Sequence, residues 1–127
     1  MNVIFVDDNE INLSIYRGIA GQLPGCKAVC YTSSAEALEW CRKNEPEIVV
    51  VDYNMPAPDG LEFIRIFRSM PDRQGIPLIM ITSAADEELR NKALALGAND
   101  FFTKPVNIVE CLARLRSLLR LREAANG

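Results

Sequence analysis

The sequence predicts one α/β domain, in which a buried parallel sheet is covered by helices on both faces. Its 127 residues, of which 49% are hydrophobic, suit a single packed core. Five short apolar runs alternate along the chain with five segments of helical periodicity, and short polar connections separate them. Such an alternation is typical of a parallel sheet between two layers of helices.

The predicted strands are short apolar runs. In the third run, three consecutive valines cannot alternate between a buried and an exposed face, so we expect this strand to be covered on both sides. The fourth run begins at Pro77, and the first position of a strand tolerates proline. We predict strands over residues 2–6, 26–31, 47–52, 77–82 and 99–103.

Capping residues mark the ends of several predicted helices. Ser34 and Asn107 are placed to cap the N-termini of the second and fifth helices, because a short polar side chain can accept a hydrogen bond from a free backbone N–H there. Gly97 is placed to end the fourth helix. We predict helices over residues 10–23, 35–43, 61–70, 86–96 and 108–123.

Apolar residues at helical spacing predict the buried faces of the first and last helices. In the first helix they are Ile11, Ile15, Ile19 and Leu23, and in the last Ile108, Leu112, Leu115 and Leu119. Cys111, Leu118 and Leu121 widen the apolar arc of the last helix. This arc is either a broad core-facing stripe or a contact for a second copy or a following domain. An excess of arginine over glutamate in residues 106–127 favours a connector or partner surface.

Composition excludes several classes of function. The net charge of -3 argues against non-specific binding of nucleic acid. No apolar run approaches the length of a membrane span, and we expect neither a leader nor membrane association. The absence of histidine excludes Ser-His-Asp triads and histidine-based zinc sites. The four cysteines, Cys26, Cys30, Cys41 and Cys111, form no CxxC motif, so we expect reduced thiols in a cytoplasmic protein.

Polar residues follow four of the predicted strands at their carboxyl ends. They are Asp7 and Asp8, Asp52, Thr82, and Lys104. Because these ends meet at one edge of a parallel sheet, we expect the side chains to converge in one crevice. Converging carboxylates raise one another's pKa, and Mg²⁺, which prefers oxygen ligands, would relieve the repulsion. An aspartate in such a site can act as a nucleophile toward phosphorus, with the lysine and the metal sharing the charge.

Each of these residues also has a purely structural interpretation. An aspartate at a strand end often caps a helix, a lysine there is often solvated, and threonine is common in strands. The functional interpretation is favoured because the residues coincide at the ends of four strands of one sheet.

The same residues resemble the receiver domain of response regulators in bacterial two-component signalling. The resemblance is carried by Asp7-Asp8, by residues 49–56 with Asp59-Gly60, by residues 81–84 and by Lys104-Pro105. It spans essentially the whole chain, which we divide into a receiver domain at residues 1–123 and a tail or linker start at 124–127. It implies a flavodoxin-like (βα)5 three-layer sandwich with strand order 2-1-3-4-5.

The resemblance also implies the roles of the site residues. Asp52 would be the phosphoacceptor, with Thr82 and Lys104 contacting the phosphoryl group. Asp7, Asp8, Asp52 and the backbone carbonyl of Asn54 would hold Mg²⁺, with Asp8 the more direct ligand of the acidic pair. The Lys104–Pro105 peptide bond is expected to be cis.

The expected switch links Thr82 to an aromatic residue. As Thr82 moves toward the phosphoryl group, Phe101 would rotate into the vacated space and reshape the face formed by the fourth helix, fifth strand and fifth helix. The resemblance further implies that Asn54 and Ala84, each two residues after a site residue, tune the phosphoryl lifetime. Ala84 cannot position a water molecule, which suggests slow self-dephosphorylation. The resemblance implies a sensor histidine kinase or phosphotransfer protein as donor, and an output domain or partner, or a second copy through the last helix. It implies no turnover enzyme and no direct nucleic-acid binding.

Three other functions stay open at this point. A haloacid-dehalogenase-like phosphohydrolase also has a nucleophilic aspartate after a strand, but Asn54 stands where its general acid belongs. A nucleotide-binding domain is disfavoured because the first turn is acidic and lacks glycine. A receiver that has lost phosphoacceptor function is disfavoured because the expected catalytic residues are all present.

Overall fold

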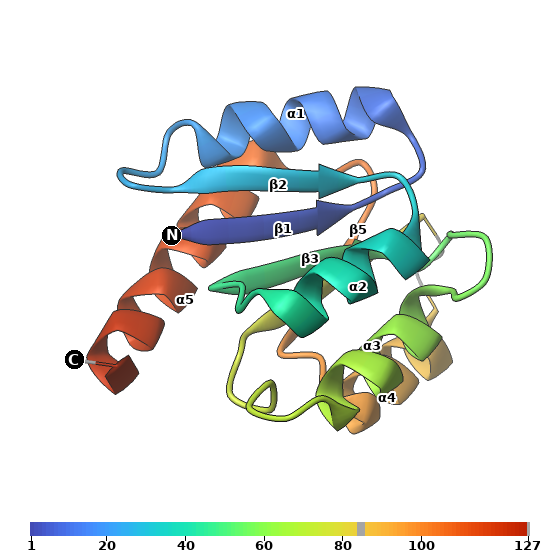
Figure 1. The fold of residues 1–127 in the computed structure, drawn as a ribbon. Coiled ribbons are helices and arrows are strands. Elements are labelled where there is room, and N and C mark those ends of the chain that lie inside the picture. Colours follow the sequence, from blue (N-terminus) through green and yellow to red (C-terminus); the bar gives the residue numbers. More distant parts are fainter. Residues whose placement is uncertain (84–85, 127) are drawn as a thin grey trace.

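A sheet of five parallel strands forms the centre of the molecule (Figure 1). The computed structural model describes residues 1–83 and 86–126. The strands are β1 (Asn2–Val6), β2 (Lys27–Tyr31), β3 (Ile48–Asp52), β4 (Leu78–Thr82) and β5 (Asp100–Thr103). Their order is β2-β1-β3-β4-β5, which confirms the predicted fold class and strand order.

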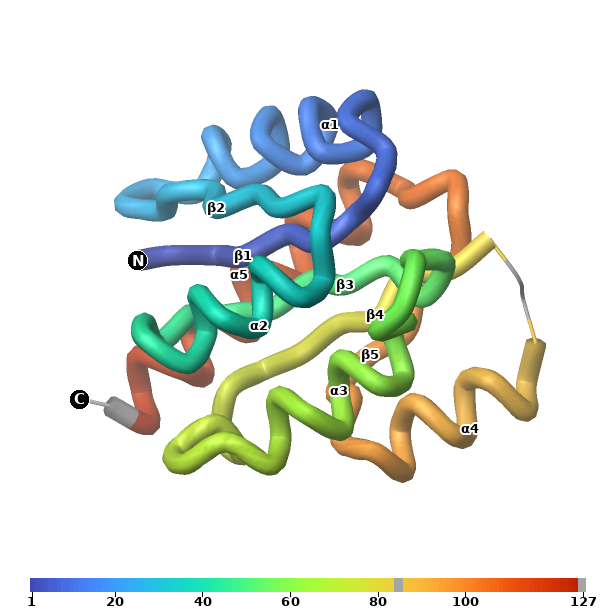
Figure 2. Tube along the Cα trace, turned by 45° about the vertical axis from the view of Figure 1, so that its right-hand side comes forward, coloured from blue at the N-terminus to red at the C-terminus, as the bar shows by residue number. Residues whose placement is uncertain are grey.

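Helices cover both faces of this sheet. They are α1 (Glu10–Ala20), α2 (Ser34–Lys43), α3 (Gly60–Ser69), α4 (Glu87–Leu96) and α5 (Ile108–Asn126). Helices α1 and α5 pack on one face, and α2, α3 and α4 on the other (Figures 1 and 2). No helix of the described ranges, 1–83 and 86–126, is long and apolar enough to cross a membrane.

Successive side chains of the central strands pack alternately into two separate hydrophobic cores, one on each face of the sheet. Val49 and Val51 of β3 pack under α2 and α3, whereas Val50 packs under α1 and α5. All five residues of β3 are buried, as the run of valines predicts. The sheet is therefore held from both sides, and the carboxyl ends of its strands are fixed in position relative to one another.

The boundaries agree with the sequence, except at the C-terminal ends of two helices. All other ends lie within one residue of the prediction, whereas α1 ends at Ala20 and α5 continues to Asn126. Asn107 caps α5 as expected, with its side-chain oxygen accepting from the Glu110 N–H at 3.0 Å. The cap of α2 is Ser33, whose hydroxyl accepts from the Glu36 N–H at 3.2 Å, and not Ser34, which is buried.

The predicted buried face of α1 is wrong in its first half. Ile11 is 73% exposed and Ile15 is 43% exposed. The residues that α1 buries are Leu13, Tyr16, Ile19 and Ala20. Four-residue steps overshoot a helical turn by about 40° each, so a stripe built only from such steps slides off the core. Leu23 is buried, but in the turn after the helix.

The buried face of α5 also differs from the predicted one. Ile108 is 49% exposed, whereas Cys111 and Leu118 are buried beside Leu115 and Leu119. Most of the wide apolar arc thus faces the core, although Leu121 is 63% exposed.

Two of the arginines of α5 hold the helix to the body of the domain. Arg114 Nε lies 2.6 Å from Asp100 Oδ2. Arg122 lies 2.6 Å from Glu45 Oε1 and 3.4 Å from Glu47 Oε2. Because both arginines are paired with acidic side chains, they contribute less positive charge to a partner surface than the sequence predicted.

The four cysteines are free thiols. Cys41 and Cys111 are buried, and burial raises the pKa of Cys41 to about 12 and that of Cys111 to about 11. These two thiols stay protonated at neutral pH and behave as small core residues.

The guanidinium of Arg68 connects the far end of α3 to two loops. It donates to the backbone carbonyls of Arg73 and Ile76 at 2.6 Å each, and to that of Gly97 at 2.7 Å. It also donates to Asn99 Oδ1 at 3.0 Å. Gly97, which ends α4 as predicted with φ of 116°, is thereby tied to α3. The C-terminal end of α4 has a fixed anchor.

We expect Arg68→Ala to lower the free energy of unfolding by more than about 1 kcal/mol, because it leaves several partly buried carbonyls without a donor. Urea unfolding followed by Trp40 fluorescence measures the change. Arg65→Ala is the matched control, since Arg65 lies on the same helix and pairs with Glu62 on the surface. It is expected to cost less than about 0.5 kcal/mol. Equal losses for the two variants would contradict the anchoring role.

Candidate functional site

The polar residues predicted to converge do meet at the carboxyl edge of the sheet. Asp7 and Asp8 follow β1, Asp52 ends β3, Thr82 ends β4 and Lys104 follows β5. Asp7 is 0% exposed, Asp52 3% and Thr82 0%, whereas Asp8 is exposed. Buried ionisable groups are costly unless they are paired, so their partners decide what this site can do.

Lys104 is the cation that holds the two buried carboxylates together. Its Nζ lies 2.7 Å from Asp52 Oδ2 and 3.3 Å from Asp7 Oδ2. Burial by itself would lower the pKa of Lys104, but the hydrogen bond and charge of Asp52, with the charge of Asp7, outweigh it and raise that pKa. The ammonium is therefore firmly protonated and supplies one positive charge against two buried acids.

Asp7 is held in an electrostatically unfavourable position. It accepts from the Asn9 N–H at 2.9 Å and from Asn12 Nδ2 at 3.2 Å. Burial, joined by the negative charge of Asp52, raises the pKa of Asp7 although the hydrogen bond from Asn9 and the charge of Lys104 oppose the rise. Converging carboxylates raise the pKa as the sequence predicted, but burial is the larger cause.

The three carboxylates provide a donor set that fits a divalent cation. One oxygen from each of Asp7, Asp8 and Asp52 lies within 4.8 Å of the others. Carboxylate oxygens are the hard ligands that Mg²⁺ prefers, and the exposed Asp8 leaves one side open to water. A cation here would neutralise the charge that Lys104 alone does not balance.

Asn54 contacts both Asp52 and Thr82, which the sequence analysis did not foresee. Its backbone N–H donates to Asp52 Oδ1 at 3.0 Å. Its side-chain oxygen accepts from Thr82 Oγ1 at 3.2 Å and from Ser83 Oγ at 3.3 Å. The resemblance implied a Mg²⁺-binding role for the backbone carbonyl of Asn54 and an influence of this residue on phosphoryl lifetime, but not these side-chain contacts. Position in a loop does not reveal where an amide side chain points.

The loop that carries Asn54 folds back closely on itself. Gly60 N donates to the Tyr53 carbonyl at 3.1 Å, and a Cβ at Gly60 would lie 2.6 Å from Tyr53 Cα. Only glycine fits this approach. The loop also contains a cis Ala57–Pro58 bond that was not expected, and the Lys104–Pro105 bond is cis as the resemblance implies.

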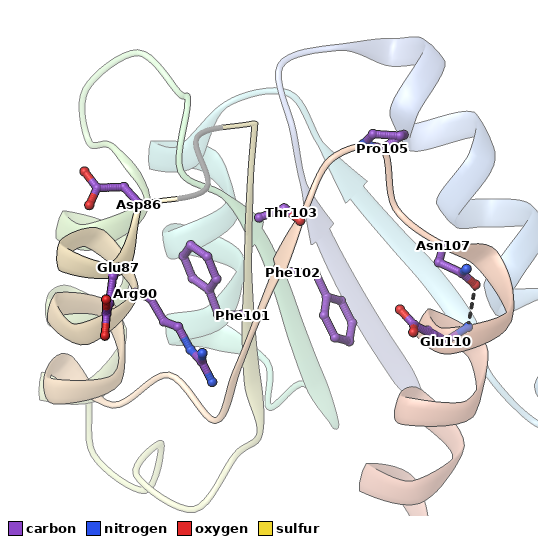
Figure 3. Close-up of a pocket in the computed structure, with 9 residues that line it drawn as sticks. All are labelled: Asp86, Glu87, Arg90, Phe101, Phe102, Thr103, Pro105, Asn107 and Glu110. Carbon is purple, nitrogen blue, oxygen red and sulfur yellow. Dashed lines mark hydrogen bonds between the residues drawn. The ribbon is translucent and has the colours of Figure 1, made fainter.

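Phe101 lies beside a pocket of about 630 Å³ between α4 and α5. In Figure 3 its ring points toward α4, whereas the ring of Phe102 points toward α5. Asp86 and Arg90 line the α4 side of the pocket, and Glu110 its α5 side. The structure thus leaves room around Phe101. Ala84, for which we expect an effect on phosphoryl lifetime, lies outside the described residues.

Comparison with known families identifies the domain. Residues 3–116 match the family model of the response regulator receiver domain. The chain belongs to this family. It is the receiver domain of a two-component response regulator, and the convergent acids with Lys104 form the site expected of a signalling phosphoacceptor. The phosphohydrolase and nucleotide-binding alternatives are thereby set aside.

Two curated relatives show the kinds of protein in which such a receiver occurs. The cyclic di-GMP phosphodiesterase response regulator RpfG of Xanthomonas campestris pv. campestris is 36% identical over 100% of this chain and 34% of RpfG. The transcriptional regulatory protein PrrA of Mycobacterium tuberculosis is 32% identical over 91% of this chain and 48% of PrrA. The chain therefore spans between a third and a half of the length of these relatives.

A solved structure supports the fold of this receiver. The receiver domain of the sensor histidine kinase PA1611 from Pseudomonas aeruginosa, described with a magnesium ion coordinated in its active-site cleft, superimposes with a TM-score of 0.83 at 22% identity. The match covers 93% of this chain and 96% of that one.

We expect Asp7→Asn to stabilise the receiver at pH 7 in the presence of EDTA, because it removes a buried charge. The pKa of Asp7 in the folded protein lies above its ordinary 3.8. The folded protein therefore holds the proton of Asp7 more tightly than the unfolded chain does. The resulting contribution to stability is complete below about pH 4 and is lost as the pH rises and Asp7 ionises. The advantage of the variant should grow between pH 4 and pH 7. Urea midpoints across this range measure it, with Asp8→Asn, at the exposed position, as control. A variant less stable than wild type at pH 7 would contradict this account.

Proposed function

We propose that Asp52 accepts a phosphoryl group from a phosphohistidine of a sensor histidine kinase or phosphotransfer protein. The observation that carries the proposal is the position of Asp52, a buried carboxylate 2.7 Å from the Lys104 ammonium in a cluster of three acids. Response regulators receive phosphoryl groups from histidine kinases and control output domains. Asp52 is the acid in this cluster that combines burial with the shortest contact to a cation.

The transfer is a nucleophilic displacement at phosphorus. An oxygen of the Asp52 carboxylate forms the new O–P bond while the P–N bond to the donor imidazole breaks, and the imidazole keeps the electron pair of that bond. Lys104 lies where it can compensate the added negative charge, and the Thr82 hydroxyl can donate to a phosphoryl oxygen. The domain thus catalyses its own phosphorylation and dephosphorylation, and it is no turnover enzyme.

Asp7, Asp8, Asp52 and the backbone carbonyl of Asn54 would hold Mg²⁺ in this site. When bound, the ion would supply charge neutralisation for the transferred group. Support for this proposal comes from the donor set, whose oxygens lie within 4.8 Å of one another, and from the raised pKa of Asp7.

The signal is proposed to leave through the face formed by α4, β5 and α5. Phosphorylation would draw Thr82 toward Asp52, and Phe101 would rotate inward and alter this face. The pocket beside Phe101 supports such a change. The output would be a domain attached after residue 123, a separate partner or a second copy. The receiver itself would bind no nucleic acid, and the name of PrrA as a transcriptional regulator concerns that whole protein. The cytoplasmic location stays a prediction.

Intact mass spectrometry tests the acceptor directly. With acetyl phosphate and Mg²⁺, we expect wild-type protein to gain one phosphoryl group and Asp52→Asn to gain none, because the amide is no nucleophile toward phosphorus. Asp59→Asn is the matched control, since Asp59 caps α3 nearby and asparagine caps equally well. Labelling of Asp52→Asn at the wild-type level would overturn the assignment.

An apolar surface beside the site fits the approach of a protein donor. A pocket of about 410 Å³ is lined by Ile15, Ile108 and Lys104. Ile15 is 43% exposed and Ile108 49%. A donor that reaches Asp52 past Lys104 would cover these isoleucines and gain their burial.

We expect Ile15→Ser to slow phosphoryl transfer from a protein phosphohistidine about tenfold, because it removes apolar contact area. Transfer from acetyl phosphate, which needs no docking surface, should be unchanged. Leu94→Ser, at a residue of α4 that is 40% exposed, is the control. An equal loss with both donors would mean that the substitution damages the site itself.

A further inference from the structure

The side chain of Asn54 binds the end of β4 in the unphosphorylated receiver. Its amide oxygen accepts from Thr82 Oγ1 at 3.2 Å, from Ser83 Oγ at 3.3 Å and from the Ser83 N–H at 3.5 Å. One acceptor thus gathers three donors from two consecutive residues. Thr82 is 0% exposed, whereas Asn54 is exposed, so the hydroxyl of a buried threonine is directed toward a surface loop.

The backbone of the same residue is bonded to the phosphoacceptor. The Asn54 N–H donates to Asp52 Oδ1 at 3.0 Å, while Lys104 occupies Asp52 Oδ2 at 2.7 Å. Asn54 therefore lies between the group that is modified and the residue that must respond. In the resting structure the Thr82 hydroxyl donates to Asn54, and it cannot donate to a phosphoryl oxygen without giving up that bond.

We propose that Asn54 is a latch that holds Thr82 and Ser83 in the resting conformation and so sets the resting balance of the switch. This inference rests on the proposed function of Asp52 and goes beyond it, since it assigns the off state to one side chain. In it Asn54 is a positioning residue that acts through Thr82. The phosphoryl oxygens compete with the Asn54 amide oxygen for one hydroxyl, and the stronger, charged acceptor wins.

If Asn54 is such a latch, its removal should shift the equilibrium between the resting and the activated conformation without any phosphorylation. Because a ligand or a substitution changes populations only through unequal interactions with the two states, loss of bonds made only in the resting state must favour the other state. Loss of one net hydrogen bond corresponds to a change of about fivefold in that equilibrium.

Amide NMR spectra of the full chain measure the shift. The two reference positions are wild type in EDTA and wild type with Mg²⁺ and beryllofluoride, which mimics the acyl phosphate. In EDTA, we expect the β5 and α4 resonances of Asn54→Leu, which keeps the shape but has no acceptor, to move toward the beryllofluoride position. The fraction in that state should rise about fivefold. Asn54→Asp keeps acceptor oxygens, and its β5 and α4 resonances should stay at the resting position.

A second background separates a latch from a general disturbance of the loop. Thr82→Val combined with Ser83→Ala removes both hydroxyls that donate to Asn54, so Asn54→Leu should add little in that background. Any of three results overturns the proposal. The β5 and α4 resonances of Asn54→Leu stay at the resting position, those of Asn54→Asp move as far as those of Asn54→Leu, or Asn54→Leu has the same effect in this background as in the wild type. Asn54→Ala replaces the leucine variant if that one does not fold.

The wild-type reference spectra separate this proposal from the function on which it rests. If beryllofluoride and Mg²⁺ leave the wild-type spectrum unchanged, the proposed switch itself fails. If they change it and Asn54→Leu does not move in EDTA, only the latch fails.

Discussion

Two carboxylates buried beside one ammonium are the constraint on which the rest of this receiver depends. Asp7 and Asp52 are separated in sequence, and they meet only because parallel strands present their carboxyl ends at the same edge. Lys104 comes from the far side of the sheet and neutralises one of the two charges. The remaining excess of negative charge makes the site receptive to a cation. In the proposed function, the added phosphoryl charge would require further hydrogen-bond donors and so would draw neighbouring side chains toward it.

The fold and the composition of the site were predictable because they depend on patterns that a chain displays locally. The alternation of apolar runs and helical segments predicted the sheet, and its topology then placed Asp7, Asp52, Thr82 and Lys104 together. The faces of α1 were less predictable, since Ile11 and Ile15 continue an apolar spacing that the core does not use. The contacts of Asn54 with Thr82 were out of reach, because they depend on how a loop folds back over a neighbouring strand. Hydrophobic periodicity carries no information about that.

Helix α4 is held differently at its two ends. Its C-terminus is tied through Gly97 to Arg68, in a network that reaches the start of β5. Its N-terminus begins after Asp86, close in sequence to Thr82 and Ser83, which Asn54 holds by a single acceptor. In the proposed switch, a charge-driven change at the sheet edge would act on the N-terminal end of α4, while Arg68 would keep the C-terminal end in place. Such an arrangement favours a pivot of the helix over its displacement as a whole.

The ion pairs of Arg122 have a consequence for the geometry of signalling. They fasten the final turns of α5 to Glu45 and Glu47, at the edge of the sheet where the strands begin (Figure 1). The acid cluster and the final turns of α5 are thus at opposite ends of the molecule. A polypeptide that continued from α5 would not contact Asp52. Phosphorylation of Asp52 would therefore reach it only through a change in the tilt of α5, whose final turns are held by ion pairs.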